Sequence, residues 1–149
     1  MRELTFGSSP CPNDTSAFYS LAFGLIDMPL RISPVLPDIE KLNRRADHGE
    51  SDLTTLSVGA FAHVGTGYRF ARSGAALGNG VGTLVVTRTP MSLVDAVSSR
   101  VAIPSRETTA YRLLRLAAPP LDEVIAMPHI LQEVSSGEAW VGLIIHESR

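Results

Sequence analysis

Polar segments with the residue types of a ligand site directly follow apolar stretches that are typical of β-strands. These segments are residues 8–15, 55–57 and 105–109, together with His146. In open α/β sheets, ligands bind beyond the carboxyl ends of the strands. All of these segments except His146 also open a predicted helix, and the backbone N–H groups and dipole at a helix start favour a carboxylate or phosphate. The pattern therefore predicts a site for a small anionic molecule.

His146 ends the apolar run 140–145, where an imidazole could transfer protons near neutral pH. A histidine on such a strand can also be a hydrogen-bonded core residue, but His146 comes at the end of the predicted strand, where ligand sites form. Ser57 could equally be only a helix N-cap, and Thr108 and Thr109 could be caps too, although two adjacent hydroxyls are more than a cap needs. These alternatives stay open at the level of sequence.

The elements that must position these residues alternate between strands and helices. We expect strands at residues 4–6, 30–36, 52–56, 68–77, 82–88, 101–104, 124–127 and 140–145. We expect one helix that is capped by Asn13 or Asp14 and stops at Gly24. Further helices are expected at 39–46, capped by Asp38, and at 58–64, 108–118 and 129–134. Pro34 should make the second strand short or place it at an edge. The alternation predicts an α/β fold with a mostly parallel sheet.

Residues 39–57 and residues 129–146 show a weak internal similarity. Each stretch is a predicted helix, then Gly-Glu, then an apolar strand that ends in a polar residue. Any helix–glycine–strand unit could look like this. The alternative is that the chain holds two related α/β lobes, with Ser57 at a strand end in one and His146 in the other.

Composition excludes several classes of protein. The chain has 149 residues, of which 44% are hydrophobic and 19% charged, so it can bury a core. Lys+Arg is 13 and Asp+Glu is 15, which gives a formal net charge of −2 with no basic stripe. Nucleic acid is therefore not an expected partner.

Cys11 is the single cysteine, which excludes an internal disulfide framework. The histidines at positions 48, 63, 129 and 146 lack metal-ligand spacing, so no metal is expected. The N-terminal residues contain no apolar run long enough for a signal peptide, and no stretch approaches membrane-spanning length. We therefore expect a cytoplasmic protein without a membrane partner.

Several motifs in order give the chain a family resemblance. They are SPCPNDT, LNRRA with GESDLTTLS, RSGAALGNGVGTLVV, VAIPSRETTAYRLLRLA and GLIIHESR. Together they resemble the 1,4-dihydroxy-6-naphthoate synthase family of the futalosine route to menaquinone, over essentially the whole chain. The resemblance implies a periplasmic-binding-protein type II fold with two α/β lobes and a cleft between them, at residues 1–84 and 85–149. It also implies a carbon–carbon lyase that converts cyclic de-hypoxanthine futalosine to 1,4-dihydroxy-6-naphthoate without a cofactor or metal.

The resemblance also assigns roles to residues of this chain. It implies that His146 is the proton acceptor. The expected contacts with a small anionic substrate are Thr55, Leu56, Ser57, Thr108 and Thr109, with Asn43 and Asn13 as further contacts.

The chain departs from the family pattern in two respects. Family members often carry a lysine where this chain has Thr55, so a cation that could meet a substrate carboxylate is missing. The family is also nearly twice as long, so we expect an incomplete second lobe and no return to the first. The chain would then be truncated, split or a fragment, inactive or weakly active alone, and prone to associate with itself or with a missing C-terminal part.

A second function class is a non-catalytic domain of the same fold that binds a small anionic solute. His146 discriminates between the two classes, because a pure binding protein needs no base at a strand end.

Overall fold

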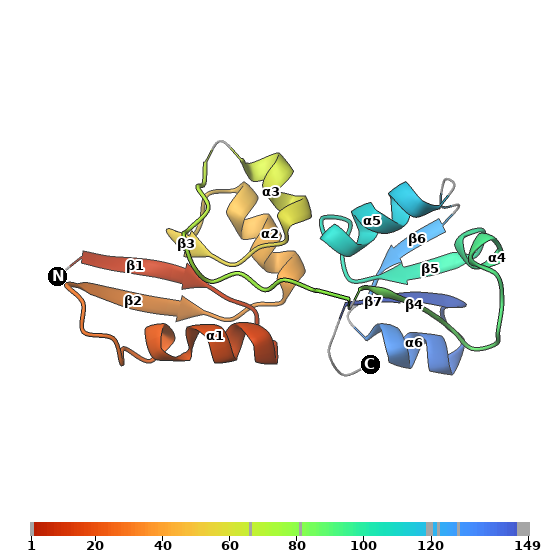
Figure 1. Cartoon of the computed structure of the whole chain (residues 1–149), viewed down its shortest axis with the longest axis horizontal. Helices are drawn as coiled ribbons and strands as arrows, with labels where there is room; N and C mark the ends of the chain where they lie inside the picture. Colours follow the sequence, from red (N-terminus) through yellow and green to blue (C-terminus); the bar gives the residue numbers. More distant parts are fainter. Residues whose placement is uncertain are drawn as a thin grey trace. The chain divides into compact units, whose positions relative to one another are not determined.

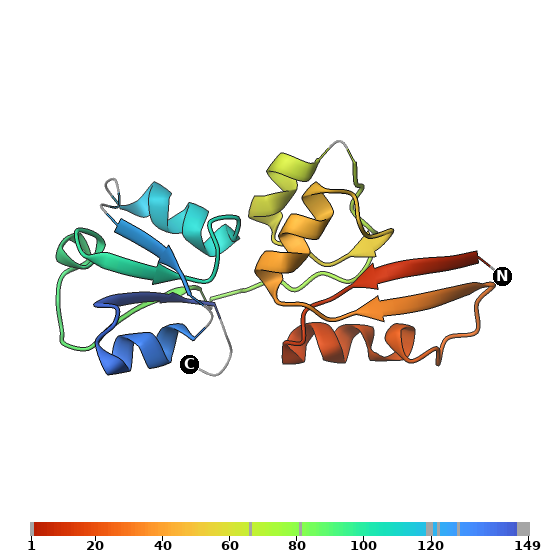
Figure 2. The same ribbon diagram turned by 180° about the vertical axis from the view of Figure 1, so that it is seen from behind.

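Two α/β units, each with its own sheet, make up the protein (Figure 1 and Figure 2). The division lies between Leu77 and Gly78. The α/β class predicted from the sequence is confirmed. The computed structural model describes residues 2–65, 67–80, 82–118, 121, 123–127 and 129–145.

The first unit is a parallel three-stranded sheet with helices on both faces. Its elements are β1 (Arg2–Gly7), α1 (Pro12–Ala22), β2 (Leu30–Val35), α2 (Ile39–Asp47), β3 (Leu53–Thr54) and α3 (Val58–Val64). The strand order is β2-β1-β3, so the Pro34-containing strand lies at an edge, as predicted. Helix α1 covers one face, and α2 and α3 cover the other (Figure 1 and Figure 2). Because all three strands are parallel, their carboxyl ends meet at one end of the sheet.

Consecutive residues at the end of β1 show how closely the layers pack. Phe6 meets Phe18 of α1 edge to face, with 5.1 Å between ring centroids. Gly7 points to the opposite face, as strand geometry requires. A Cβ atom there would lie 2.8 Å from Leu42 Cδ2 of α2 and 2.9 Å from Thr54 Oγ1. The glycine therefore lets α2 and β3 approach the backbone directly before the first polar segment.

The start of α1 differs from the prediction. Its N-cap residue is Cys11, which makes no capping bond with its side chain, and Pro12 takes the first helical position. The predicted cap at Asn13 or Asp14 is wrong, because the fixed φ of Pro12 suits a first turn and places the cap two or three residues earlier. The side chain of Asp14 instead bonds to other segments.

The strand expected at residues 68–77 is also wrong. No strand occurs in the described stretch 67–80. Gly74 has a φ of +87°, outside strand geometry, and a Cβ atom there would lie 2.7 Å from Phe18 Cε1. The backbone at Gly74 therefore lies close to the Phe18 ring in a conformation that a β-strand does not adopt.

The second unit is a mixed four-stranded sheet. Its elements are β4 (Leu84–Thr87), α4 (Leu93–Val97), β5 (Arg100–Ile103), α5 (Thr109–Ala117), β6 (Glu123–Ala126), α6 (Ile130–Ser136) and β7 (Val141–Ile144). The strand order is β4-β7-β5-β6, with only the β4–β7 pair antiparallel. Helix α4 was not predicted, although Ser92 accepts a hydrogen bond from Asp95 N at 3.1 Å, the local signature of a helix start.

Both faces of the second sheet are buried. One face packs against α4 and α5 through a cluster of Ala96, Val97, Val101, Ile103, Ala110, Tyr111, Leu114, Val141 and Leu143. The other face packs against α6 through Ala102, Ile130, Val134, Ala139 and Ile144. The middle strands β5 and β7 are thus held from both sides.

A hydrogen-bonded pair joins β1 to the start of β3, and we predict a pH-dependent effect of breaking it. Asp52 Oδ2 accepts from Thr5 N and from Thr5 Oγ1, each at 2.9 Å. These bonds, with the backbone bond the larger cause, hold the pKa of Asp52 below its ordinary value of 3.8. The stabilisation is therefore complete above pH 3.8 and is lost as the pH falls through the lower pKa of the folded state.

We expect Asp52→Asn to lower the free energy of unfolding at about pH 6, and the difference from the parent to shrink below about pH 4. Urea unfolding across that range measures it. Thr5→Ser keeps the hydroxyl and should keep the pH dependence of the parent. A difference between Asp52→Asn and the parent that stays constant with pH would contradict this explanation.

Candidate functional site

The ends of β1 and β3 bring the first two polar segments together. Gly7 pairs with Thr54 in the parallel register. Thr55 N donates to Gly7 O at 2.9 Å, and Ser8 N donates to Val35 O, at the end of β2, at 3.0 Å. Residues 8–15 and 55–57 therefore begin at the same end of the first sheet, where the strand-end rule placed them.

Asp14 connects these two segments. Its Oδ2 atom accepts from Thr55 Oγ1 at 2.9 Å and from Ser9 N at 3.1 Å. Ser9 Oγ in turn accepts from Cys11 N at 3.3 Å. One carboxylate thus ties the first turn of α1 to the loops that follow β1 and β3. The sequence analysis considered Asp14 only as a cap, because the bond to Thr55 spans 41 residues and leaves no local signal.

Asn43 of α2 holds the end of the segment 55–57. Its side chain is 2% exposed, and its Oδ1 atom accepts from Ser57 N at 3.2 Å. Ser57 occupies the N-cap position of α3, as predicted, but its hydroxyl makes no capping bond. Leu56 is half-buried, and Asn13 is exposed on α1. The contacts of all these residues with a ligand stay predictions.

Buried polar atoms at this end of the sheet lack partners. Within the described part of the chain, Asn43 Nδ2 and Ser8 Oγ have no hydrogen-bond partner, although each residue is only 2% exposed. A buried donor or acceptor without a partner costs about 1–3 kcal/mol. The first unit therefore carries unmet hydrogen-bonding capacity next to the predicted contact residues.

In the second unit, the segment 105–109 forms the start of α5. Thr108 is 1% exposed, and its hydroxyl donates to Ser105 O at 2.8 Å and accepts from Tyr111 N at 3.3 Å. Thr108 is therefore an N-cap, one of the alternatives that the sequence left open. Thr109 is the first residue of the helix and is half-buried.

Arg106 adds a cation near this helix start. Its Nη2 atom donates to Val124 O at 2.9 Å, and its Nη1 atom donates to Tyr111 Oη at 3.4 Å. These bonds fix the guanidinium between β6 and α5. The sequence analysis did not select Arg106, because its bond to Val124 forms only when β6 lies beside β5.

His146 lies outside the described residues. Strand β7, which precedes it, runs between β4 and β5 and parallel to β5. The described part of the strand ends at Ile144, two positions before His146 in the sequence. Its role as proton acceptor stays a prediction.

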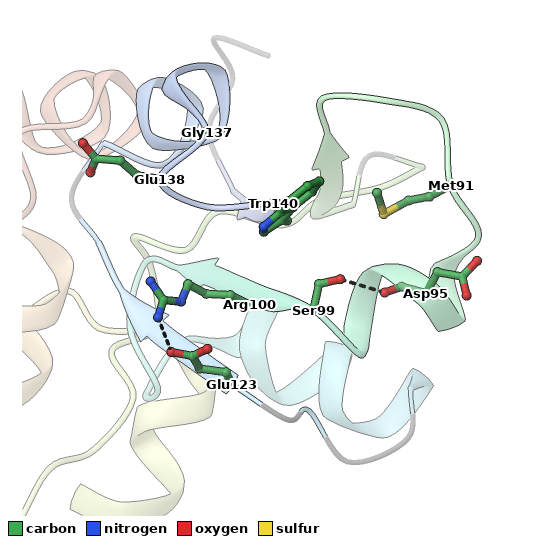
Figure 3. A pocket seen from close by; sticks show the side chains of 8 residues that line it. All are labelled: Met91, Asp95, Ser99, Arg100, Glu123, Gly137, Glu138 and Trp140. Carbon is green, nitrogen blue, oxygen red and sulfur yellow. Dashed lines mark hydrogen bonds and ion pairs between the residues drawn. The ribbon is translucent and has the colours of Figure 1, made fainter.

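A hollow of about 720 Å³ lies at the opposite end of the second sheet (Figure 3). It is near the starts of β5, β6 and β7, and Arg100 and Glu123 form an ion pair of 2.8 Å there. Its lining residues are Met91, Asp95, Ser99, Arg100, Glu123, Gly137, Glu138 and Trp140. None of the residues predicted from the sequence lines it.

Neither a metal cluster nor a membrane span is found in the described ranges. They contain no group of three or more His, Cys, Asp and Glu side chains that could hold a metal ion. No helix in them is both long and apolar enough to cross a membrane.

The two α/β units, with polar segments at the strand ends of each, define a protein of the periplasmic-binding-protein type II class. Two solved structures share this fold at 16% sequence identity and a TM-score of 0.55 each: a putative lipoprotein from Actinomyces odontolyticus and XAC2383 from Xanthomonas citri bound to chloride ion. Each match covers 95% of this chain, and 69% and 64% of the respective structures. Residues 4–149 match the family model described as menaquinone biosynthesis, and the chain belongs to this family. The resemblance inferred from the sequence motifs is confirmed.

Curated relatives in the same family carry one name. The chain is 49% identical to the 1,4-dihydroxy-6-naphtoate synthase of Thermus thermophilus and 36% identical to that of Streptomyces coelicolor. The matches cover 100% and 98% of this chain but 54% of each relative, so the chain spans about half the length of the curated relatives it matches. The crystal structure of protein AF1704 from Archaeoglobus fulgidus superposes with a TM-score of 0.90 at 37% identity, over 98% of this chain and 55% of that structure.

Proposed function

We propose that the chain carries part of the site of a lyase that converts cyclic de-hypoxanthine futalosine to 1,4-dihydroxy-6-naphthoate in menaquinone biosynthesis. The observation that carries this proposal is the 49% identity to a 1,4-dihydroxy-6-naphtoate synthase along the whole chain. Because the chain spans only 54% of that relative, the substrate and the activity of the whole protein are parts of the proposal.

The start of α5 binds the anionic group of the substrate in this proposal. The backbone N–H groups of a helix's first turn have no partners within the helix, and the helix dipole favours negative charge there. Arg106 adds a fixed positive charge near this turn. Thr108 shapes the turn by capping it, and Thr109 contributes a side-chain hydroxyl at the first helical position.

His146 is the proposed proton acceptor. The reaction must remove a proton so that the sugar-derived carbon unit can leave and the new ring can become aromatic. An imidazole can accept that proton near neutral pH.

We predict that Thr109→Ala weakens binding of cyclic de-hypoxanthine futalosine about tenfold, the value of a hydrogen bond to a charged group. Isothermal titration calorimetry with the full chain measures the affinity, and liquid chromatography with mass spectrometry detects the naphthoate product. Thr87→Ala is a matched control, because that hydroxyl lies in the same unit and donates to Thr89 O at 2.8 Å.

Unchanged affinity in Thr109→Ala would contradict the assignment of this contact. Binding of the substrate without product formation, by a complete protein that contains this chain, would favour the other class, a non-catalytic domain for an anionic solute.

A further inference from the structure

We propose that the strand ends of the first unit bind hydroxyl groups of the ligand and exclude its carboxylate, with Asp14 as the positioning residue that sets this choice. The inference rests on the proposed function and deepens it, because it names the kind of substrate group that the first unit takes. It follows from the direction of each hydrogen bond at this end of the first sheet.

The hydroxyl of Thr55 can only accept a hydrogen bond from a ligand. A threonine hydroxyl has one proton, and Thr55 donates it to Asp14 Oδ2 at 2.9 Å. The lone pairs of the oxygen remain, and the side chain is half-buried, so a ligand can reach it. The matching ligand group must therefore carry an O–H or N–H.

Asp14 strengthens this preference by its charge. Both of its hydrogen bonds, from Thr55 and from Ser9, end on Oδ2, so within the described residues Oδ1 remains as a second acceptor. An ionised carboxylate accepts hydrogen bonds and does not donate them. A ligand carboxylate placed here would meet a like charge as well as two acceptors.

The side chain of Asn43 adds a hydrogen-bond donor beside the segment 55–57. Because Ser57 offers an N–H, the amide oxygen of Asn43 must face it, which fixes the orientation of the amide. The Nδ2 group is then left buried without a partner in the described part of the chain. A hydroxyl donates as well as accepts, so a ligand hydroxyl can match the acceptors of Thr55 and Asp14, whereas an ionised carboxylate can match neither.

The second unit offers the opposite arrangement. The proton of Thr108 is used by Ser105 O, but the start of α5 presents backbone N–H donors, and Arg106 lies nearby. These groups favour an acceptor that carries negative charge. The start of α5 therefore favours a different kind of ligand group from the one that the strand ends of the first unit favour.

Nuclear magnetic resonance of the ¹⁵N-labelled full chain tests this with two probes, methyl β-D-ribofuranoside and benzoate. The diol should shift the amide signals of Ser9, Thr55 and Ser57, and benzoate should shift those at the start of α5 instead. Thr55→Val should weaken the diol response roughly fivefold, the value of one neutral hydrogen bond, while Thr55→Ser retains it.

Thr5→Val is the matched control, because Thr5 also donates to an aspartate, Asp52 Oδ2, at 2.9 Å in the same sheet. It should lower stability and leave the diol response unchanged. Asp14→Asn removes the negative charge and should let benzoate shift the Thr55 amide while it weakens the diol response. A general loss of structure would weaken both responses, so this reversal of selectivity separates positioning from folding.

The inference is overturned if benzoate shifts the Thr55 amide of the parent chain as strongly as the diol does, or if the diol leaves it unmoved. Neither probe is turned over, so these results do not depend on catalysis. Failure of the proposed function would appear instead as absence of naphthoate product from a complete enzyme that contains this chain, with the probe responses intact.

Discussion

In a complete enzyme that contains this chain, replacing His146 with asparagine should lower kcat for cyclic de-hypoxanthine futalosine by roughly 100-fold or more, with little change in substrate affinity. Loss of a general base typically costs a factor of about 10² to 10⁴. Asparagine has a similar size and can keep a hydrogen bond, but it cannot take up the proton at neutral pH. Product formation gives kcat, calorimetry gives the affinity, and circular dichroism checks the fold.

His129→Asn is the control for this experiment. His129 also belongs to the second unit and precedes α6, where its side chain makes no capping bond. Its replacement should leave kcat near that of the parent. A folded His146→Asn variant that turns over substrate at the parental rate would show that His146 is not the base, and Cys11 or a carboxylate would then have to be considered.

A single added methyl group at Gly142 should destabilise the second unit by about 1–3 kcal/mol, the usual cost of overfilling a packed core. Gly142 lies in β7 under α6. A Cβ atom there would press against Ile130 Cγ2, lie 2.9 Å from Val134 Cγ2 and lie 3.2 Å from Val86 Cγ2. The contacts come from α6 and from β4, so relief would require a helix and a strand to move.

Thermal unfolding of Gly142→Ala and of Gly82→Ala measures this effect. Each kcal/mol corresponds to about 4–8 °C in Tm for a unit of this size. Among the described residues, no atom lies within 4 Å of a Cβ atom built at Gly82, so that variant should melt close to the parent. Equal melting temperatures for the two variants would mean that α6 adjusts to the added methyl group, contrary to the expectation.

Local patterns account for the parts of the fold that the sequence predicted. The cap at Asp38 is confirmed, and Thr108 is a cap as well, which was one of the alternatives left open by the sequence. Each side chain accepts from a backbone N–H three residues ahead, at Lys41 and Tyr111. The apolar runs also predicted the positions of β1 and β7. The start of α1 was missed, because Pro12 outweighs the capping preference of the residues that follow it.

The sequence predicted where the candidate site lies, but not which of its side chains form hydrogen bonds with one another. The strand-end rule selected residues 8–15 and 55–57, and the parallel pairing of β1 and β3 brings their starts together. The bond from Thr55 to Asp14 and the bond from Ser57 to Asn43 depend on how α1 and α2 pack. A pattern of residue types along one sequence carries no signal for such pairs.

The strand order β4-β7-β5-β6 has a consequence for how the chain folds while the ribosome synthesises it. Strand β7 is the last strand of the second unit in the chain, yet it separates β4 from β5. While the ribosome is still adding residues before Val141, β4 has no native neighbour and one edge of β5 is unpaired. Such edges are prone to pair with other chains. The described four-stranded sheet of the second unit can therefore form only after β7 has left the ribosome, whereas the three described strands of the first unit have all been made once residue 54 has emerged.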